Sequence, residues 1–283
     1  MPRYVIITDT DSSLPPDLAE QHGIGLVPIN IQFDDGTTFN DLTIDNARLF
    51  ARVDREGRMP STAAPAPGAF GVAFEAALQG GADGVICYCV SSAISATYSA
   101  AMLAAESLPD GAITVVDTGT LSMAQGFVAL AAAQAAQAGA SRQEILSTAD
   151  AVRERATLYG ALSTLKYLAM GGRVPHLAAG MAGLLNIRPI LGVQEGKLDL
   201  LEKVRTRQRA WARLASLCQE TVGGGQMARW ALLHVNALEE ATALGELLRG
   251  ELACPAEPLV MALNPGLSVH TGAGLVGVAL VRE

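Results

Sequence analysis

Short β-forming runs alternate with helical patterns through the first half of the chain, and this alternation constrains the fold more than any other feature. Strands are predicted at residues 4–8, 26–33, 84–89 and 112–116. Helices are predicted at residues 46–55, 68–78, 96–107, 122–138 and 141–155. The stretch 58–68, rich in proline and alanine, predicts an irregular loop. Such a βα rhythm is typical of a parallel sheet covered by helices.

The pattern changes after residue 156, where we expect a second domain to begin. Strands predicted at 189–194 and 197–204 are separated only by Glu195 and Gly196, a hairpin spacing that implies antiparallel pairing. The other predicted elements are strands at 158–162, 230–235, 259–263 and 275–281 and helices at 165–170, 207–222 and 238–249. The sequence therefore predicts an N-terminal α/β domain over residues 1–156 and a C-terminal mixed α/β domain over residues 157–283.

Charge and composition narrow the classes of partner. The 283 residues include 20 Lys and Arg against 28 Asp and Glu, a net charge of −8, and the basic residues form no long run. Nucleic acids and anionic membrane surfaces are therefore not expected as partners. Hydrophobic residues make up 50% of the chain but aromatic residues only 5%, so the apolar interior suits aliphatic burial better than base stacking.

The cysteines and the apolar stretches indicate a cytoplasmic protein. Cys87, Cys89, Cys218 and Cys254 fit neither a metal knuckle nor a dense disulfide framework, and the first two are expected to share one face of a buried strand. No export signal is visible at the N-terminus. The uncharged stretches 84–105 and 118–141 contain serines, glutamines and weakly hydrophobic alanines, so buried helices explain them better than membrane spans.

Three polar segments lie at predicted junctions between elements, where ligand sites of α/β proteins concentrate. They are residues 61–67, 90–98 and 264–277. In the second, serines stand where a buried strand ends and a helix begins, so amides and hydroxyls at the helix N-terminus could bind an anion. The alternative is that Ser92 or Ser95 only caps the helix.

The other candidates are single polar residues beside glycines. His270 and Thr271 precede Gly272 and Gly274, which would let the backbone approach a ligand, although a lone histidine is more often structural. Arg173 follows two glycines and could receive a carboxylate or phosphate, or could be a solvated surface arginine. The common signatures of hydrolases, metalloproteases and nucleotide-binding loops do not occur, so no metal or cofactor is expected.

Motifs in a fixed order run along nearly the whole chain. In the N-terminal part they are Thr8-Asp9-Thr10, Leu14-Pro15, Val27-Pro28, Pro60, Thr62 and Pro65. In the middle they are Ser91-Ser92-x-x-Ser95-x-Thr97-Tyr98, Val116-Asp117-Thr118 and Ser122-Met123. In the second half they are Leu165-Lys166-Tyr167-Leu168, Gly171-Gly172-Arg173, Leu185-Asn186-Ile187-Arg188-Pro189-Ile190 and His270-Thr271-Gly272-x-Gly274. Together these motifs resemble those of the DegV family of fatty-acid-binding proteins.

The resemblance implies a fold and a ligand. The fold is a DegV-like α/β arrangement, with an N-terminal three-layer α/β/α domain around a parallel sheet and a C-terminal two-layer domain with a mixed sheet. The implied ligand is one long-chain fatty acid, with its tail in an interior tunnel and its carboxylate at the domain interface. The residues that match the family's carboxylate site are Thr62, Ser91, Ser92, Arg173, His270, Thr271 and Gly272.

The resemblance also implies a partner. In the family, a separate fatty acid kinase phosphorylates the bound acid, and the acyl phosphate feeds phospholipid synthesis, so the protein itself would catalyse nothing. Arg205, in the basic cluster Lys203-Val204-Arg205-Thr206-Arg207, resembles the family's kinase-docking stretch, although it could be a solvated strand end.

Four alanines depart from the family pattern and leave alternatives open. Ala63, Ala64, Ala96 and Ala273 stand where the family has other residues. Ala63 and Ala64 remove polar side chains beside Thr62, and Ala273 loosens a turn that proline would stiffen. One alternative is an acyl ester hydrolase with Ser92 as nucleophile and His270 as base. The other is a carrier of a different amphiphilic acid.

Overall fold

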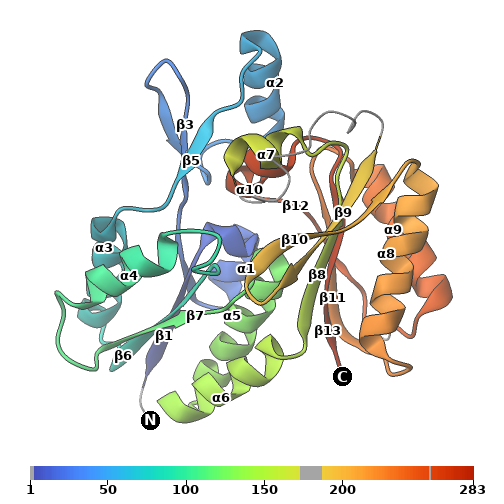
Figure 1. Cartoon of the computed structure of the whole chain (residues 1–283). Coiled ribbons are helices and arrows are strands. Elements are labelled where there is room, and N and C mark those ends of the chain that lie inside the picture. Colours follow the sequence, from blue (N-terminus) through green and yellow to red (C-terminus); the bar gives the residue numbers. More distant parts are fainter. Residues whose placement is uncertain (1–2, 173–186, 255) are drawn as a thin grey trace. The chain divides into compact units, whose positions relative to one another are not determined.

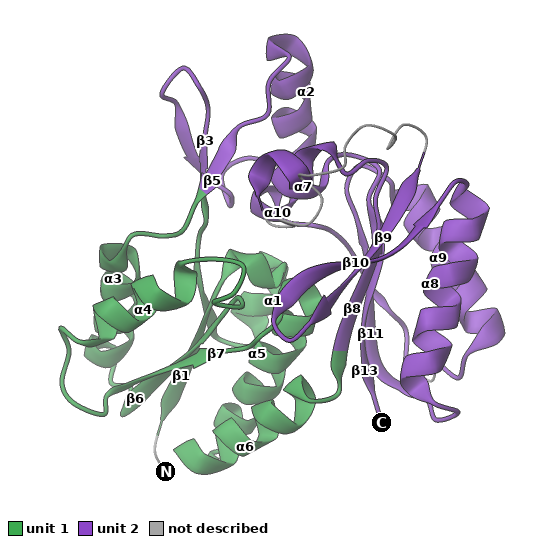
Figure 2. Cartoon of the chain, in the orientation of Figure 1, with its two compact units in different colours: residues 1–30, 63–156 green, residues 31–62, 157–283 purple. Residues whose placement is uncertain are grey.

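The computed structural model describes residues 3–172, 187–254 and 256–283, which form two compact units (Figures 1 and 2). Unit 1 comprises residues 1–30 and 63–156, and unit 2 comprises residues 31–62 and 157–283. The predicted domains have a boundary at the same place, after residue 156. They differ from the compact units at residues 31–62, which the prediction assigns to the N-terminal domain.

Unit 1 is built on a four-stranded sheet in the order β2-β1-β6-β7, and all three strand pairs are parallel. The strands are β1 (Tyr4–Asp9), β2 (Ile24–Val27), β6 (Gly84–Cys89) and β7 (Ile113–Asp117). The helices are α1 (Pro16–Gln21), α3 (Pro67–Gln79), α4 (Thr97–Ala105), α5 (Ser122–Gln137) and α6 (Arg142–Arg153). Helices cover both faces of the sheet, which confirms the predicted three-layer arrangement (Figure 1).

The central strand β6 shows why the sheet needs both layers. Every residue of β6 is buried, as expected for a parallel strand with helices on both faces. Cys87 and Cys89 pack on one face with Phe70 and Phe74 of α3. The two thiols lie 3.7 Å apart, so the predicted shared face is confirmed. The hydrogen bond with Cys87 and burial both raise the pKa of Cys89, so its thiol stays protonated.

Unit 2 contains a six-stranded mixed sheet in the order β10-β9-β8-β13-β11-β12. The strands are β8 (Ala156–Ala161), β9 (Arg188–Gln194), β10 (Lys197–Val204), β11 (Met227–His234), β12 (Leu259–Ala262) and β13 (Val276–Arg282). β9 and β10 form the predicted antiparallel hairpin, while β11 and β12 are parallel. Glu195 and Gly196 have φ angles of 49° and 77°, the conformation that a two-residue hairpin turn of type I′ requires.

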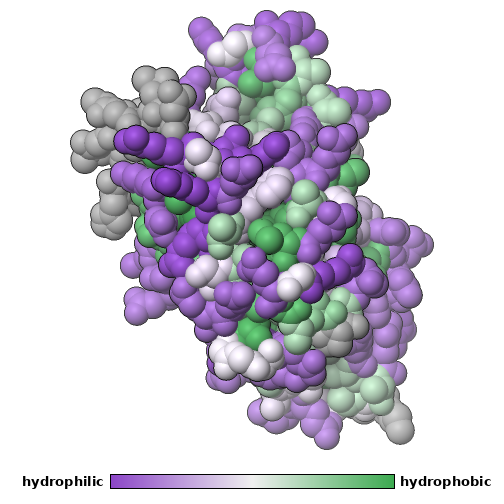
Figure 3. Space-filling model, turned by 90° about the vertical axis from the view of Figure 1, so that its right-hand side faces the viewer, coloured by the Kyte–Doolittle hydropathy of each residue, from purple (hydrophilic) through white to green (hydrophobic). Residues whose placement is uncertain are grey.

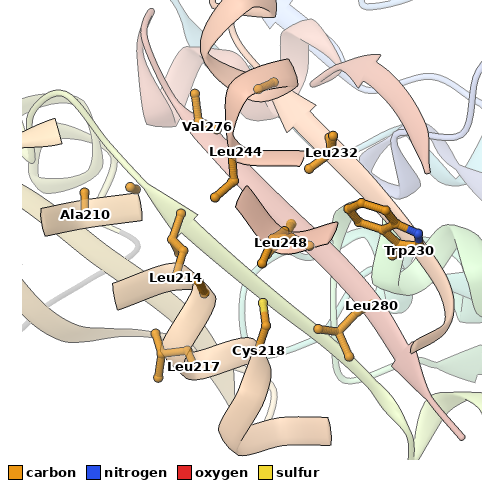
Figure 4. Close-up of a cluster of buried hydrophobic side chains, with 14 of the residues drawn as sticks. Ala210, Leu214, Leu217, Cys218, Trp230, Leu232, Leu244, Leu248, Val276 and Leu280 are labelled. Atoms are coloured by element: carbon orange, nitrogen blue, oxygen red, sulfur yellow. The ribbon is translucent and has the colours of Figure 1, made fainter. Parts of the chain in front are cut away.

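The core of unit 2 lies between this sheet and two helices, α8 (Arg207–Val222) and α9 (Leu238–Glu251) (Figure 4). α8 contributes Leu214 and Cys218, and α9 contributes Leu244 and Leu248. Burying each leucine side chain contributes roughly 1.5–3 kcal/mol. Burial also raises the pKa of Cys218 to about 12, so this thiol is not reactive at neutral pH.

Residues 31–62 belong to unit 2 because they bond to the C-terminal part of the chain. They include β4 (Thr38–Asn40) and α2 (Asn46–Glu56), and β3 (Asn30–Gln32) and β5 (Ser61–Ala63) extend one residue beyond them. Asn46 Nδ2 donates to the carbonyl of Leu263 at 2.8 Å, and Asn264 Nδ2 donates to the Asp41 carboxylate at 2.7 Å. Asp41 and Asn46 are both buried, so both bonds are made away from water, where the loss of a hydrogen bond is costly.

Three sequence predictions are wrong in detail. The strand predicted over residues 26–33 is two strands, because Pro28 has no N–H to donate and breaks the ladder. The stretch 58–68 is not irregular throughout, since it contains β5 and the start of α3. Two helices were not predicted, α1 and α10 (Pro265–Thr271), and both are too short to show a helical period.

Helix α7 (Lys166–Gly171) packs against α10 within unit 2. In the described ranges of the chain, no helix combines the length and the apolar character needed to cross a bilayer.

We predict that Tyr88→Phe leaves stability unchanged or raises it by up to about 1 kcal/mol, because the buried hydroxyl has no hydrogen-bond partner among the described residues. Burial also raises the pKa of the Tyr88 phenol, because the charged form would be poorly solvated there. The matched control is Tyr159→Phe, since the Tyr159 hydroxyl shares a 2.8 Å hydrogen bond with Thr221. That variant should lose about 0.5–1.5 kcal/mol in urea unfolding. A larger loss for Tyr88→Phe than for Tyr159→Phe would contradict the prediction.

Candidate functional site

Ser91 and Ser92 follow β6, at the carboxyl edge of the parallel sheet of unit 1. Ser91 is buried and Ser92 is exposed. The Val90 amide donates to the Asp9 carboxylate at 2.8 Å, and the Ser91 amide donates to the Thr120 carbonyl at 2.9 Å. The Ser92 amide donates to the Asp117 carboxylate at 3.2 Å. Three consecutive backbone donors are therefore already engaged within the unit.

This pattern corrects the prediction that free amides converge here to bind an anion. Helix α4 begins only at Thr97, and its N-cap is Ala96, with no side-chain capping bond. The amides of Ile94 and Ser95 both donate to the Ser91 carbonyl. Side-chain hydroxyl groups therefore remain for a ligand at the Ser91-Ser92 turn, and for the Ser92 hydroxyl no hydrogen-bond partner exists among the described residues.

A buried carboxylate, Asp9, organises this end of unit 1, although the sequence analysis does not single it out as a site residue. Its oxygens accept hydrogen bonds from the amides of Asp11 and Val90 and from Nε2 of Gln125 at 3.2 Å. Asp9 ends β1, which has β2 on one side and β6 on the other, so it stands where the strand order reverses. Ligands of open parallel sheets bind at such switch points. The signal in the sequence was the unbroken polar run from Thr8 to Ser13 directly after an apolar strand.

Two serines beside Asp9 adopt unusual backbone conformations. Ser13 and Ser122 have φ angles of 52° and 53°, a region that non-glycine residues rarely occupy. Their hydroxyl groups are joined by a 3.2 Å hydrogen bond, and both side chains are buried. Strained backbone held by its surroundings concentrates at functional sites, so these serines mark the same edge of the sheet.

Thr62 and His270 meet in unit 2, although they are far apart in the sequence. Thr62 Oγ1 and His270 Nε2 share a 2.7 Å hydrogen bond. β5 carries Thr62, and the last turn of α10 carries His270. The hydrogen bond brings these two predicted residues together within unit 2, and their assignment to a carboxylate site stays a prediction. It also engages the ring nitrogen that a catalytic base would use, so no observation favours the hydrolase alternative.

Thr271 and Gly272 end helix α10, and both have structural contacts. The Thr271 hydroxyl donates to the Leu267 carbonyl at 3.3 Å. Gly272 has a φ of 77°, and a Cβ at this position would lie 2.4 Å from the Tyr167 ring of α7. Only glycine fits there. The assignment of these two residues to a carboxylate site stays a prediction.

Of the two arginines predicted to have a function, Arg173 and Arg205, the structure describes only Arg205. Arg173 lies outside the described residues. Arg205 lines a groove of about 540 Å³ between the end of β10 and α8, together with Lys203, Arg209 and Arg213. Arg213 is paired with Glu202 and Glu220 at 2.7 Å each. Among the residues described, the side chains of Lys203, Arg205 and Arg209 have no carboxylate partner.

No cluster of three or more histidine, cysteine, aspartate or glutamate side chains that could hold a metal occurs in the part of the chain that the structure describes. The fold and the site therefore define an α/β protein with hydroxyl groups at the strand ends of a parallel sheet and a threonine–histidine pair in a second unit.

Comparison with known proteins identifies the family. The model of the DegV family, described as an uncharacterised protein family, matches residues 3–283. A DegV domain-containing protein of Streptomyces coelicolor is 34% identical over 281 residues, covering 99% of each chain, and one of Mycobacterium bovis is 35% identical over 278 residues, covering 98% of this chain and 96% of the relative. The chain belongs to the DegV family.

Solved structures agree with this assignment. A DegV family protein of Thermus thermophilus, described as binding fatty acid, superposes with a TM-score of 0.91 at 30% identity, covering 99% of this chain and 100% of the relative. DegV of Bacillus subtilis, described as a fatty acid binding protein, gives a TM-score of 0.88 at 28% identity over the whole of both chains. The predicted DegV-like fold with its parallel and mixed sheets is thereby confirmed.

We predict that Asp9→Asn lowers the free energy of unfolding by about 1–3 kcal/mol, because one of its N–H donors would then face an amide instead of a carboxylate. Hydrogen exchange should show faster exchange of the Val90 amide. Asp110→Asn is the control, since Asp110 is exposed in the same unit, and it should change stability by less than about 0.5 kcal/mol. Equal stability of the two variants would contradict the role given to Asp9.

Proposed function

We propose that this protein binds one long-chain fatty acid and catalyses no reaction itself. Its carboxyl group would be held by the hydroxyls of Thr62, Ser91 and Ser92, with Arg173 and His270 near the head group. The adjoining Thr271 and Gly272 would complete this site. The observation that carries the proposal is the 2.7 Å hydrogen bond between Thr62 and His270. It holds a hydroxyl and an imidazole side by side, where both could contact the same carboxylate. The fatty acid binding described for the relatives from T. thermophilus and B. subtilis supports it.

The energetics of such a ligand are favourable. Burying a tail of about 14 methylenes in an interior tunnel, at ~0.8 kcal/mol each, contributes on the order of 11 kcal/mol before the costs of association. An ionised carboxylate in a site of low dielectric constant must be paired with donors, because leaving it unpaired costs several kcal/mol. Because the amides of Val90, Ser91 and Ser92 are engaged, side-chain hydroxyls would supply the donors at this turn.

We expect protein produced in bacteria to contain about one equivalent of bound fatty acid, because burial of the tail makes dissociation slow. Denaturing extraction followed by mass spectrometry measures the bound lipid. Gently purified protein that contains no lipid, or only uncharged lipid, would contradict the proposal. A different amphiphilic acid in the extract would favour the alternative carrier function.

We predict that Thr62→Ala or Ser92→Ala weakens fatty-acid binding by roughly 1–3 kcal/mol, the scale of a hydrogen bond to a charged group. Thr242→Ala is the matched control, because the Thr242 hydroxyl only donates to the Leu238 carbonyl of its own helix. The Thr242→Ala variant should bind fatty acid with the same affinity as the wild type. Unchanged affinity in both site variants and in the double variant would show that the carboxylate binds elsewhere.

The second part of the proposal is that a separate fatty acid kinase phosphorylates the bound acid, and that the acyl phosphate enters phospholipid synthesis. His270 would act at this more highly charged head group. The free thiols of all four cysteines fit the reducing cytoplasm, which we propose as the location. The kinase would dock at the basic groove around Arg205. Helices α8 and α9 lie at the right of Figure 1, and the face seen from that side in Figure 3 is mostly hydrophilic, which suits a charged partner surface.

Arg205→Glu should slow association with a cognate kinase and flatten its dependence on salt, because a charge at the rim of an interface chiefly steers the encounter. Fatty-acid affinity should not change. Lys197→Glu makes the same change in charge at the other end of β10 and should leave association within about twofold of the wild-type rate. If both variants associate equally fast, the groove is not the docking surface.

A further inference from the structure

A second, smaller pocket lies in unit 2, and the described residues that line it do not include Thr62 or His270. Its volume is about 70 Å³. It forms where Ser163, just after β8, and the first residue of β9, Arg188, meet the first turns of α8 and α9. Small apolar side chains contribute to its lining, among them Ala210 and Val276. Charged groups lie around this apolar base.

One of the two guanidinium groups in the pocket is held in place. Arg207 Nη1 lies 3.1 Å from a carboxylate oxygen of Glu240, and its guanidinium stacks 5.2 Å from the centre of the Trp211 ring. Both partners also line the pocket. These contacts fix the direction of a side chain that is otherwise half exposed.

The other guanidinium, that of Arg188, has no such partner. Arg188 is partly buried, and among the described residues no carboxylate or carbonyl accepts a hydrogen bond from its side chain. The pocket thus contains two guanidiniums and one carboxylate, a net charge of +1. A partly desolvated guanidinium that lacks an acceptor is costly, and a bound anion would remove that cost.

The size of the pocket limits what the anion can be. Its volume of about 70 Å³ is small beside the ~300–1,000 Å³ of pockets that hold drug-sized ligands. A small oxyanion fits such a space, whereas a nucleotide or an acyl chain does not. The planar, forked donors of arginine match the oxygens of a phosphate or carboxylate group.

We propose that this pocket is a binding site for a small oxyanion of the phosphate type, contacted first by Arg188 and secondarily by Arg207. None of the described residues that line this pocket belongs to the proposed fatty-acid site. Ser163, in the same pocket, donates a hydrogen bond to the Ala273 carbonyl, and Ala273 and the pocket residue Gly274 belong to the turn that follows α10. The pocket wall is therefore part of the turn that ends the helix carrying His270.

The test is calorimetric titration of the full-length protein with inorganic phosphate at constant ionic strength. Arg188→Gln should weaken phosphate binding at least about tenfold, the effect of losing a hydrogen bond between two charged groups. Arg188→Lys should retain part of the affinity. Arg209→Gln removes an equal charge from the neighbouring groove and should leave binding unchanged. Glu240→Gln should tighten binding, because it frees Arg207 and removes the only carboxylate among the described residues of the pocket lining.

Opposite effects of Arg188→Gln and Glu240→Gln would not arise from simple destabilisation, and melting without phosphate checks that each variant is folded. The proposal is overturned if wild-type protein does not bind phosphate, or if Arg188→Gln and Arg209→Gln weaken it equally, since the response would then reflect diffuse surface charge. Parallel titrations with sulfate and acetate show whether the site selects tetrahedral anions. Acetate binding tighter than phosphate would overturn the assignment to a phosphate-type anion.

Discussion

The buried carboxylate of Asp9 is the constraint on which the arrangement of unit 1 depends. A carboxylate without solvent must be surrounded by donors, and these come from the backbone after β1, the backbone after β6 and the side chain of α5. Satisfying one charged group therefore fixes three segments at the carboxyl edge of the sheet. The Ser91-Ser92 turn, which follows Val90 directly, takes its position from this network and from Asp117.

In unit 2, a comparable role falls to hydrogen bonds between segments that are distant in sequence. Asn46, Asn264 and His270 connect residues 31–62 to the C-terminal part of the chain. The first two bonds hold α2 and its neighbouring strands beside α10, and the third brings the Thr62 hydroxyl to an imidazole nitrogen. The Thr62–His270 pair thus results from the packing of residues 31–62 against residues 157–283, the two segments that make up unit 2.

Positive charge is unevenly distributed on an otherwise acidic chain. Four basic residues, Lys203, Arg205, Arg207 and Arg209, lie within seven positions at the junction of β10 and α8, and Arg188 pairs with Val204 in the adjacent strand. The hairpin register therefore brings several cations together on a chain whose net charge is −8. Some are neutralised by neighbouring glutamates, as Arg207 and Arg213 are, and the others are available to anionic partners.

Local sequence patterns predict the parallel sheet, the β9–β10 hairpin and most of the long helices, because hydrophobic periods and turn residues are local signals. The sequence also pointed to Thr62, Ser91, Ser92 and His270 through motif resemblance. It did not reveal α1 and α10, which are too short for a period, or the engaged amides after β6. Three features depend on how the chain folds in space: the membership of residues 31–62 in unit 2, the acceptors around Val90 to Ser92, and the Arg188 pocket. The physical reason is that hydrogen bonds and burial of charge depend on which distant segments meet, and no local pattern encodes that.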